Sequence, residues 1–226
     1  MKTPLSILAG SAVLVLLLLL ASPAPDKAAP ATEGLPWQID IQPDGSSRVF
    51  GLTPGRSTLD DARARFALVP QVAVVAAPGE PGSLEAYFES VMAGSITGKI
   101  VLTLDMPKET IEQMRGRATK TEYMESTTRK ATLSAEDRAL AERAAIRSIA
   151  FIPSTQLDEA TILQRFGVPA ERLRGGEHVE HFLYPAKGLD VVLDAKGKEL
   201  LQYVAPRDFA RLREPLAERP ATRSAP

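Results

Sequence analysis

The feature of this sequence that most constrains its fold is a short phrase that occurs twice. Residues 57–66 are STLDDARARF, and residues 155–167 are TQLDEATILQRFG. Each copy begins with a hydroxyl-bearing residue that can cap a helix, continues with acidic residues in the first turn, and carries apolar residues at helical spacing. The sequence therefore predicts two short amphipathic helices. The alternative is that Leu-Asp-acidic-Ala is simply a favourable helix start that the chain uses twice.

Runs with the alternation of half-buried strands follow both phrases. QVAVVAAP, LEAYFESVM and GKIVLTLD follow the first, and EHVEHFLYP, GLDVVLD and KELLQYV follow the second. We therefore predict an α+β fold with two similar modules, residues 37–106 and 149–205, each a short helix packed on a small antiparallel sheet. Residues 107–148 are expected to form a solvated helical connector between the modules. Residues 206–226 are expected to form a C-terminal helix and a disordered tail.

The N-terminal segment predicts export. Leu5–Ala21 contains no charged residue, and residues 1–24 have the length of a membrane-spanning helix, with Lys2 favouring a cytoplasmic N-terminus. The alternative is a signal peptide that is cleaved after its small residues, although Pro25 would then follow the scissile bond. Residues 25–36 are rich in Pro and Ala and predict a tether. We expect a single-pass inner-membrane protein with its folded body in the periplasm, or a secreted periplasmic protein if the segment is cleaved.

Composition excludes several classes of protein. Hydrophobic residues make up 44% of the chain and charged residues 24%, which is ordinary for a globular protein. The formal net charge of −1 gives no electrostatic support for a nucleic-acid partner. Cysteine is absent, so the chain has no disulfide, no thiolate metal site, no cysteine nucleophile and no cysteine to lipidate.

A family resemblance follows from these elements. A capped short helix ending in RFGVP, followed by strands that end in GLDVVLDAKGKELLQYV, resembles the small outer-membrane-assembly lipoproteins of the SmpA/OmlA (BamE-like) type. The beta-lactamase-inhibitor-protein-like modules share the same plan. The resemblance covers residues 149–204 best and 48–105 less well, which suggests a tandem arrangement. It implies helices on one face of an antiparallel sheet and a role in binding proteins without catalysis. This chain departs from the lipoprotein pattern in lacking the lipidated cysteine.

The candidates for chemistry are few. His178 and His181 are the only histidines, and on a strand they would point to opposite faces, so we interpret them as partly exposed strand residues and not as a metal site. Residues 51–58 include glycine and a helix start but lack the lysine and spacing of a phosphate-binding loop. The doublets Asp60–Asp61 and Asp158–Glu159 suit helix starts better than paired catalytic acids. The sequence therefore predicts no catalytic, cofactor-binding or metal-binding residue.

Protein binding remains the leading hypothesis. We expect a membrane-tethered envelope module that binds a protein partner of unknown identity, with Phe182 and Tyr184 as candidate anchors because aromatic side chains are favoured at interfaces. The alternative for these two rings is that they pack in the core. The alternative functions are binding of a small apolar or lipid ligand between helices and sheet, and hydrolysis at a site that the sequence does not reveal.

Overall fold

The computed structural model describes residues 33–124 and 127–217. The chain divides into Met1–Glu33 and a compact unit from Gly34 onward, and only the second is described below. The predicted anchor, residues 1–24, lies outside the described residues. No helix within 33–124 and 127–217 is long and apolar enough to cross a membrane.

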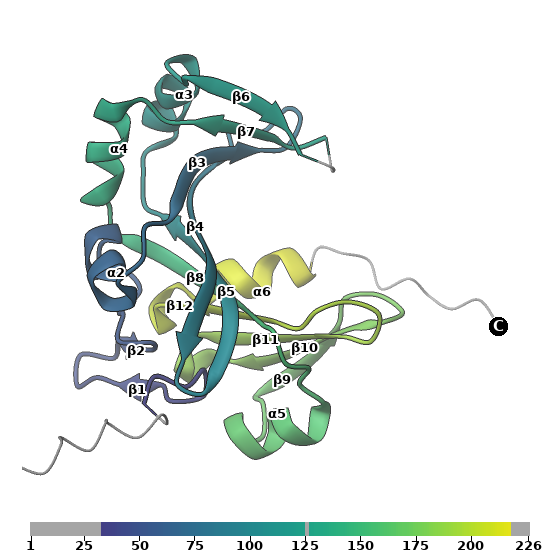
Figure 1. Ribbon diagram of the computed structural model, residues 1–226. Coiled ribbons are helices and arrows are strands. Elements are labelled where there is room, and N and C mark those ends of the chain that lie inside the picture. The colour runs from purple at the N-terminus through teal and green to yellow at the C-terminus, as the bar shows by residue number, and fades with distance from the viewer. Residues whose placement is uncertain (1–32, 125–126, 218–226) are drawn as a thin grey trace, which may run out of the picture. The chain divides into compact units, whose positions relative to one another are not determined.

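The described part of the chain is an α+β structure built on one large antiparallel sheet (Figure 1). Ten strands form this sheet in the order β6-β7-β3-β4-β5-β8-β12-β11-β10-β9. Their bounds are β3 Gln71–Ala76, β4 Ser83–Ala93, β5 Ile96–Leu104, β6 Lys120–Tyr123, β7 Arg129–Thr132, β8 Ile146–Pro153, β9 Glu171–Arg174, β10 Val179–Tyr184, β11 Leu189–Asp194 and β12 Leu200–Val204. A separate two-stranded ribbon pairs β1 (Asp40–Ile41) with β2 (Ser47–Arg48).

Five α-helices accompany the sheet in the described residues. They are α2 (Leu59–Phe66), α3 (Lys108–Gly116), α4 (Ala135–Glu142), α5 (Glu159–Phe166) and α6 (Ala210–Ala217), with short 3-10 turns at Pro185–Lys187 and Pro206–Asp208. The helices α2 and α5 are those predicted from the repeated phrase. Both lie on the same face of the sheet, since Phe66 of α2 packs against Phe88 and Phe166 of α5 packs against Tyr184. The main core lies between this face and these helices.

The two repeated helices begin at different points of their phrases. Thr58 caps α2 and forms a capping box with Asp61. The hydroxyl of Thr58 and the carboxylate of Asp61 are the groups that this motif requires. Asp158, and not the expected Thr155, caps α5 by accepting a hydrogen bond from the backbone N–H of Thr161. The two helices therefore align when their N-cap residues, Thr58 and Asp158, are matched, and not when the Leu-Asp-acidic-Ala residues are matched. Each helix is followed by three antiparallel strands, β3-β4-β5 after α2 and β9-β10-β11 after α5.

The connector between the predicted modules contains a hairpin that the sequence analysis did not foresee. The strands β6 and β7 lie between α3 and α4, and β7 pairs with β3 at the edge of the main sheet. Residues 120–132 are mostly polar and belong to the segment for which the sequence predicts a solvated helical connector. Their strands are stabilised by backbone pairing with β3, which lies far away in the sequence, and by burial of Ala131 and Leu133.

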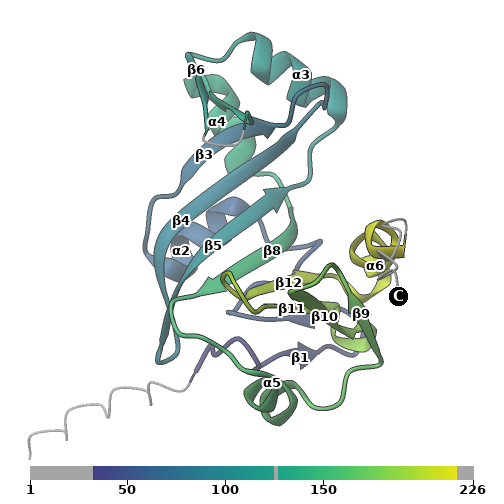
Figure 2. The ribbon, with the colours of Figure 1, turned by 90° about the vertical axis from the view of Figure 1, so that its right-hand side faces the viewer.

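The second face of the sheet is covered only in part. Phe209, which directly precedes α6, and Leu212 of α6 pack there against Leu183 of β10 and Val204 of β12. The same face of β4 and β5 is turned toward the viewer in Figure 2, with α2 behind the strands.

Candidate functional site

The predicted anchors Phe182 and Tyr184 belong to the core. Their exposed fractions are 0% and 5%, so neither ring is presented to a partner. Tyr184 donates a hydrogen bond from its hydroxyl to the carbonyl of Gly167 at 2.9 Å, and burial raises the pKa of its phenol to about 12. These contacts fix the end of α5 against β10. The interpretation as surface anchors is therefore corrected in favour of the alternative, that the rings pack in the core.

The two histidines occupy unlike environments. His178 precedes β10 and is exposed, whereas His181 lies within β10 and is buried. The Nδ1 atom of His181 lies 2.8 Å from the Oδ2 atom of Asp190 on β11. The expectation of two partly exposed strand histidines is therefore wrong for His181. Within the described residues, no three His, Asp or Glu side chains gather in a way that could hold a metal ion.

The other sequence candidates are used by the fold itself. Asp61 and Asp158 accept hydrogen bonds at the starts of α2 and α5, which is the structural role expected of them. In the segment 51–58, the backbone N–H of Gly55 donates to the carbonyl of Ile146, and that of Ser57 donates to Thr53. These amides are already satisfied, so the loop does not form a free anion cradle.

A surface that no helix of the described residues covers lies on the second face of the central strands. Along β4, Leu84, Ala86 and Phe88 point into the core, so the intervening Glu85 and Tyr87 point to the opposite face. Residues that lie opposite Glu85 and Tyr87 on the neighbouring strands point to the same face and form two rows across the sheet. We define the open sheet face as six half-buried residues of these rows, which are Glu85, Tyr87, Val101, Thr103, Ala150 and Gln202.

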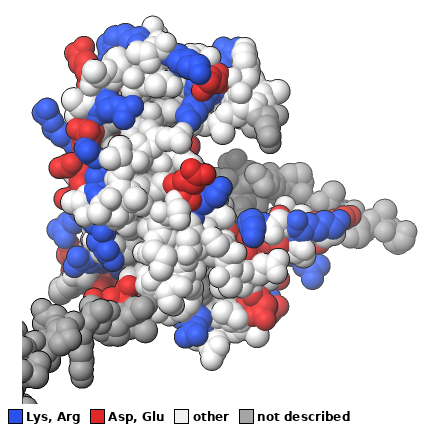
Figure 3. Space-filling model, in the orientation of Figure 1, with Lys and Arg blue, Asp and Glu red and all other residues white. Residues whose placement is uncertain are grey.

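All six side chains of the open sheet face are half-buried. They are partly shielded by one another, and no helix of the described residues lies over β4 and β5 on this side (Figure 2). In the space-filling view this face is seen edge-on and is directed to the right, below the region that carries β6 and β7 (Figure 3). Charges of both signs are mixed over the visible surface, which agrees with the near-zero net charge.

Glu85 is the charged member of the open sheet face. The hydroxyl of Ser83 donates a hydrogen bond to its Oε1 atom at 2.6 Å. Burial raises the pKa of the Glu85 carboxyl above its ordinary value, and the Ser83 hydrogen bond opposes this only in part. Glu85 forms no ion pair with any lysine or arginine in residues 33–124 and 127–217. Its charge is therefore partly desolvated without a compensating cation.

Tyr87 supplies an aromatic surface beside Glu85. Its ring is half-buried, and the ammonium of Lys99 lies 5.9 Å from the ring centroid. Sequence reasoning missed this residue even though LEAYFES contains the signal: Tyr87 falls out of phase with the large apolar residues of its own strand. Aromatic side chains with one exposed face are common anchors of protein interfaces.

Comparison of the chain with protein-family models, with curated proteins and with solved structures finds no match. The resemblance to the SmpA/OmlA lipoproteins and the beta-lactamase-inhibitor-protein-like modules therefore stays a prediction from the sequence.

Proposed function

We propose that the protein is a non-catalytic binding module of the cell envelope and that the open sheet face is its docking surface for a protein partner. The single observation that carries this proposal is the half-buried face that contains Glu85 and Tyr87, over which no helix of residues 33–124 and 127–217 lies. A sheet normally buries one face against helices and solvates the other with polar residues. Here the second face of β4, β5 and β8 combines polar side chains with an aromatic ring, aliphatic side chains and one acid that no cation of the described residues pairs.

The chemistry of this face specifies the kind of partner. Tyr87, Val101 and Ala150 offer an apolar patch, and Thr103 and Gln202 offer hydrogen-bonding groups around it. Glu85 adds a partly desolvated negative charge that a lysine or arginine would neutralise. The partner we propose is therefore a protein that presents an apolar segment with one basic side chain. Charge pairing of this type contributes specificity as well as affinity.

The location of the module is part of the same proposal. The uncharged stretch Leu5–Ala21 supports an inner-membrane anchor at residues 1–24, with the tether 25–36 holding the folded body in the periplasm. Membranes washed with high salt should retain the protein, because a leucine-rich span is held by hydrophobic transfer and not by charge. A soluble protein that begins near Pro25 would instead establish the cleaved, secreted alternative.

The two-module arrangement also belongs to the proposal. Its support is that α2 and α5 have similar caps, lie on one face of the sheet, and each precede three antiparallel strands. In this interpretation the two halves meet at β5 and β8 and share a continuous core. Such a pairing gives a wider sheet, and therefore a wider docking face, than one module supplies.

Site-specific photo-cross-linking tests the docking surface. A photoreactive amino acid at Tyr87, in the full-length protein in cells, should form an adduct with one protein that mass spectrometry then identifies. The matched control is the same amino acid at Tyr123, which is 71% exposed but lies on β6, outside the open sheet face. The identified protein is then purified and titrated against the wild type and the Glu85→Gln and Tyr87→Ala variants.

The proposal requires that both substitutions weaken binding of the purified partner by tenfold or more while the fold is retained. Equal affinity for the wild type and both variants would show that the adduct reflects proximity alone. Adducts at Tyr123 without adducts at Tyr87 would place the docking surface elsewhere.

A further inference from the structure

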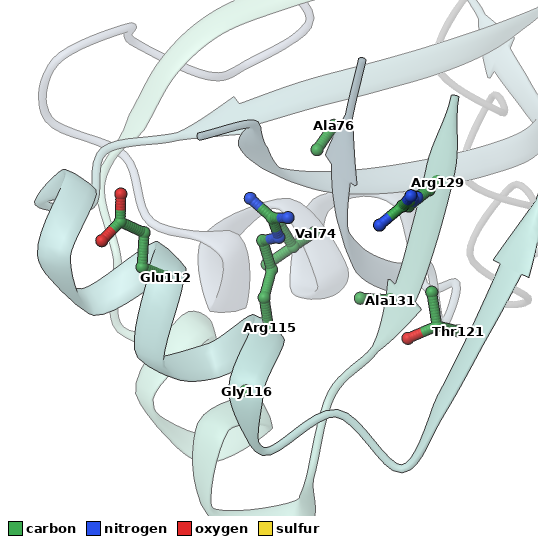
Figure 4. Close-up of a pocket in the computed structure, with 8 residues that line it drawn as sticks. All are labelled: Val74, Ala76, Glu112, Arg115, Gly116, Thr121, Arg129 and Ala131. Atoms are coloured by element: carbon green, nitrogen blue, oxygen red, sulfur yellow. The ribbon is translucent and has the colours of Figure 1, made fainter. Parts of the chain in front are cut away.

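A separate cavity lies beneath α3 at the β6–β7 end of the sheet. Its volume is about 440 Å³, within the range of small-molecule sites. Figure 4 shows its walls, which are α3 on one side and the strands β3, β7 and β6 on the other. Val74 and Ala76 of β3 and Ala131 of β7 form an apolar floor. On β3, Ala73 lies opposite Glu85 and therefore points to the same side as the open sheet face. Val74 is the next residue of the strand and points to the other side, so the cavity opens on the opposite face of β3.

Two arginines approach the cavity from opposite walls, Arg115 from α3 and Arg129 from β7 (Figure 4). The Nη1 atom of Arg115 donates to the carbonyls of Glu80 and Pro81 at 3.2 and 3.1 Å. The guanidinium of Arg129 lies over the ring of Tyr123, 5.3 Å from its centroid. Neutral groups therefore orient both cations without cancelling their charge.

Neither cavity arginine is paired with an acid of the described residues, in contrast to several arginines elsewhere in the chain. Arg117 is bonded to Asp137, and Arg213 to Glu171, each through two nitrogen atoms. Glu112 is the acid that lines the cavity. It lies on the far side of Arg115 from Arg129 in Figure 4 and forms no ion pair with either arginine.

We propose that this cavity binds a carboxylate attached to a short apolar group. Guanidinium groups match the planar carboxylate through paired N–H donors, and two of them can hold both of its oxygens. The floor of Val74, Ala76 and Ala131 receives the apolar part, and the Thr121 hydroxyl adds a further polar group at the wall. Two sources share this chemistry: a free small organic acid, and the C-terminal residue of a peptide chain.

Binding to the full-length protein is measured by calorimetry and by NMR of the arginine side chains. The probes are hexanoate, the neutral hexanamide, inorganic phosphate, a peptide ending in Ala-Leu with a free carboxylate, and the same peptide as its C-terminal amide. Hexanoate or the acid peptide should bind and shift the side-chain signals of Arg115 and Arg129. If hexanoate binds more tightly, the ligand is a free small organic acid; if the acid peptide binds more tightly, the ligand is the C-terminal residue of a peptide chain.

Arg129 is the residue to change, because Tyr123 is the one side chain of the described residues with which its guanidinium has a recorded interaction, and its loss should leave the fold intact. Arg129→Gln should weaken carboxylate binding by about tenfold or more, and Arg129→Lys should recover it only in part, because lysine keeps the charge but loses the planar pair of donors. The matched control is Arg174→Gln, which removes an exposed arginine from β9 at the other edge of the sheet. This control should bind like the wild type.

Three outcomes would overturn the proposal. These are equal binding of hexanamide and hexanoate, binding of phosphate but of neither carboxylate, and no change in affinity in Arg129→Gln. The result does not depend on the proposed docking surface, since Glu85→Gln should leave carboxylate binding in the cavity unchanged.

Discussion

Glu85 carries a half-buried carboxylate on the open sheet face, and its replacement by glutamine is expected to raise the free energy of unfolding at neutral pH. The side chain of glutamine has nearly the same shape and can still accept the hydrogen bond from Ser83. What the substitution removes is the charge, which burial disfavours and which no cation of the described residues compensates.

The size and the pH dependence of this effect follow from the raised pKa. A carboxyl whose folded-state pKa lies above its unfolded value favours the folded state most when it is protonated, so its contribution is lost as pH rises through the folded pKa. One pKa unit corresponds to about 1.4 kcal/mol. Because Glu85 remains partly exposed, solvent screening reduces the gain for the Glu85→Gln variant to roughly 0.5–1 kcal/mol at pH 7. The difference should vanish near pH 3.5, where the acid is protonated in both states.

Urea unfolding of the wild type and the variant at pH 7 and pH 3.5 measures this difference directly. For a chain of this size, 1 kcal/mol corresponds to a shift in melting temperature of about 2–4 °C. Glu89→Gln is the matched control, since Glu89 lies on the same strand but is exposed. A variant that is less stable than the wild type at pH 7, or equally stabilised at both pH values, would refute the reasoning from desolvation.

The same substitution should have the opposite effect on binding. If the partner neutralises Glu85 with a basic side chain, Glu85→Gln loses a largely desolvated ion pair, which is worth about 2 kcal/mol or more, or roughly 30-fold in affinity. A residue whose removal stabilises the protein and weakens its binding is characteristic of a functional surface. A purely structural role for Glu85 predicts no change in affinity.

The remaining predictions concern buried groups. Phe182→Ala should lower the free energy of unfolding by about 3–5 kcal/mol in urea titrations, because the ring is fully buried. His181→Ala should cost about 1–3 kcal/mol, since it leaves both oxygens of the buried Asp190 without a partner among the described residues. Arg117→Gln should cost about 1–3 kcal/mol at pH 7 because the Asp137 carboxylate is buried, and Arg117 chiefly holds its pKa below the ordinary value. This last loss should shrink as pH falls through the folded pKa of Asp137, when the acid no longer needs its cation.

The controls for the histidine and arginine substitutions are exposed residues of the same type that hold no buried acid of the described residues. His178→Ala should leave the free energy of unfolding within about 0.5 kcal/mol of the wild type, because His178 is exposed. Arg174→Gln should likewise be neutral. Equally mild effects of His181→Ala and His178→Ala, or of Arg117→Gln and Arg174→Gln, would show that the contacts with Asp190 or Asp137 do not contribute to stability.

Local signals in the sequence were sufficient for the helices. The Thr58 cap, the acidic first turn and the apolar spacing of α2 all lie within a few residues of one another. The cap of α5 was placed three residues too early because Thr155 and Asp158 are both good capping residues. Which of the two residues caps the helix depends on where β8 ends and on how the helix packs. Neither of these can be determined from the neighbouring residues in the sequence.

Long-range pairing explains what the sequence did not reveal. The strand β7 exists because its backbone pairs with β3, and its four residues carry too weak an alternation to be distinguished from a polar loop. The contact between His181 and Asp190 joins two strands through positions that are diagonal across the sheet. Neither residue is unusual in its own strand, so only the register brings them together.

The alternation of side chains between the two faces of a strand distinguishes the wrong candidate anchors, Phe182 and Tyr184, from the better candidate, Tyr87. In VEHFLY of β10, apolar residues occupy both phases, which is typical of a strand buried on both faces, and the structure places Phe182 on the α5 side and Leu183 on the α6 side. In LEAYF of β4, the apolar residues occupy one phase only, and Tyr87 is in the other with Glu85. An aromatic residue that shares its phase with a charge, opposite a fully apolar phase, cannot be serving the core of its own strand. This argument from phase favours Tyr87 over Phe182 as an anchor before any contact is considered.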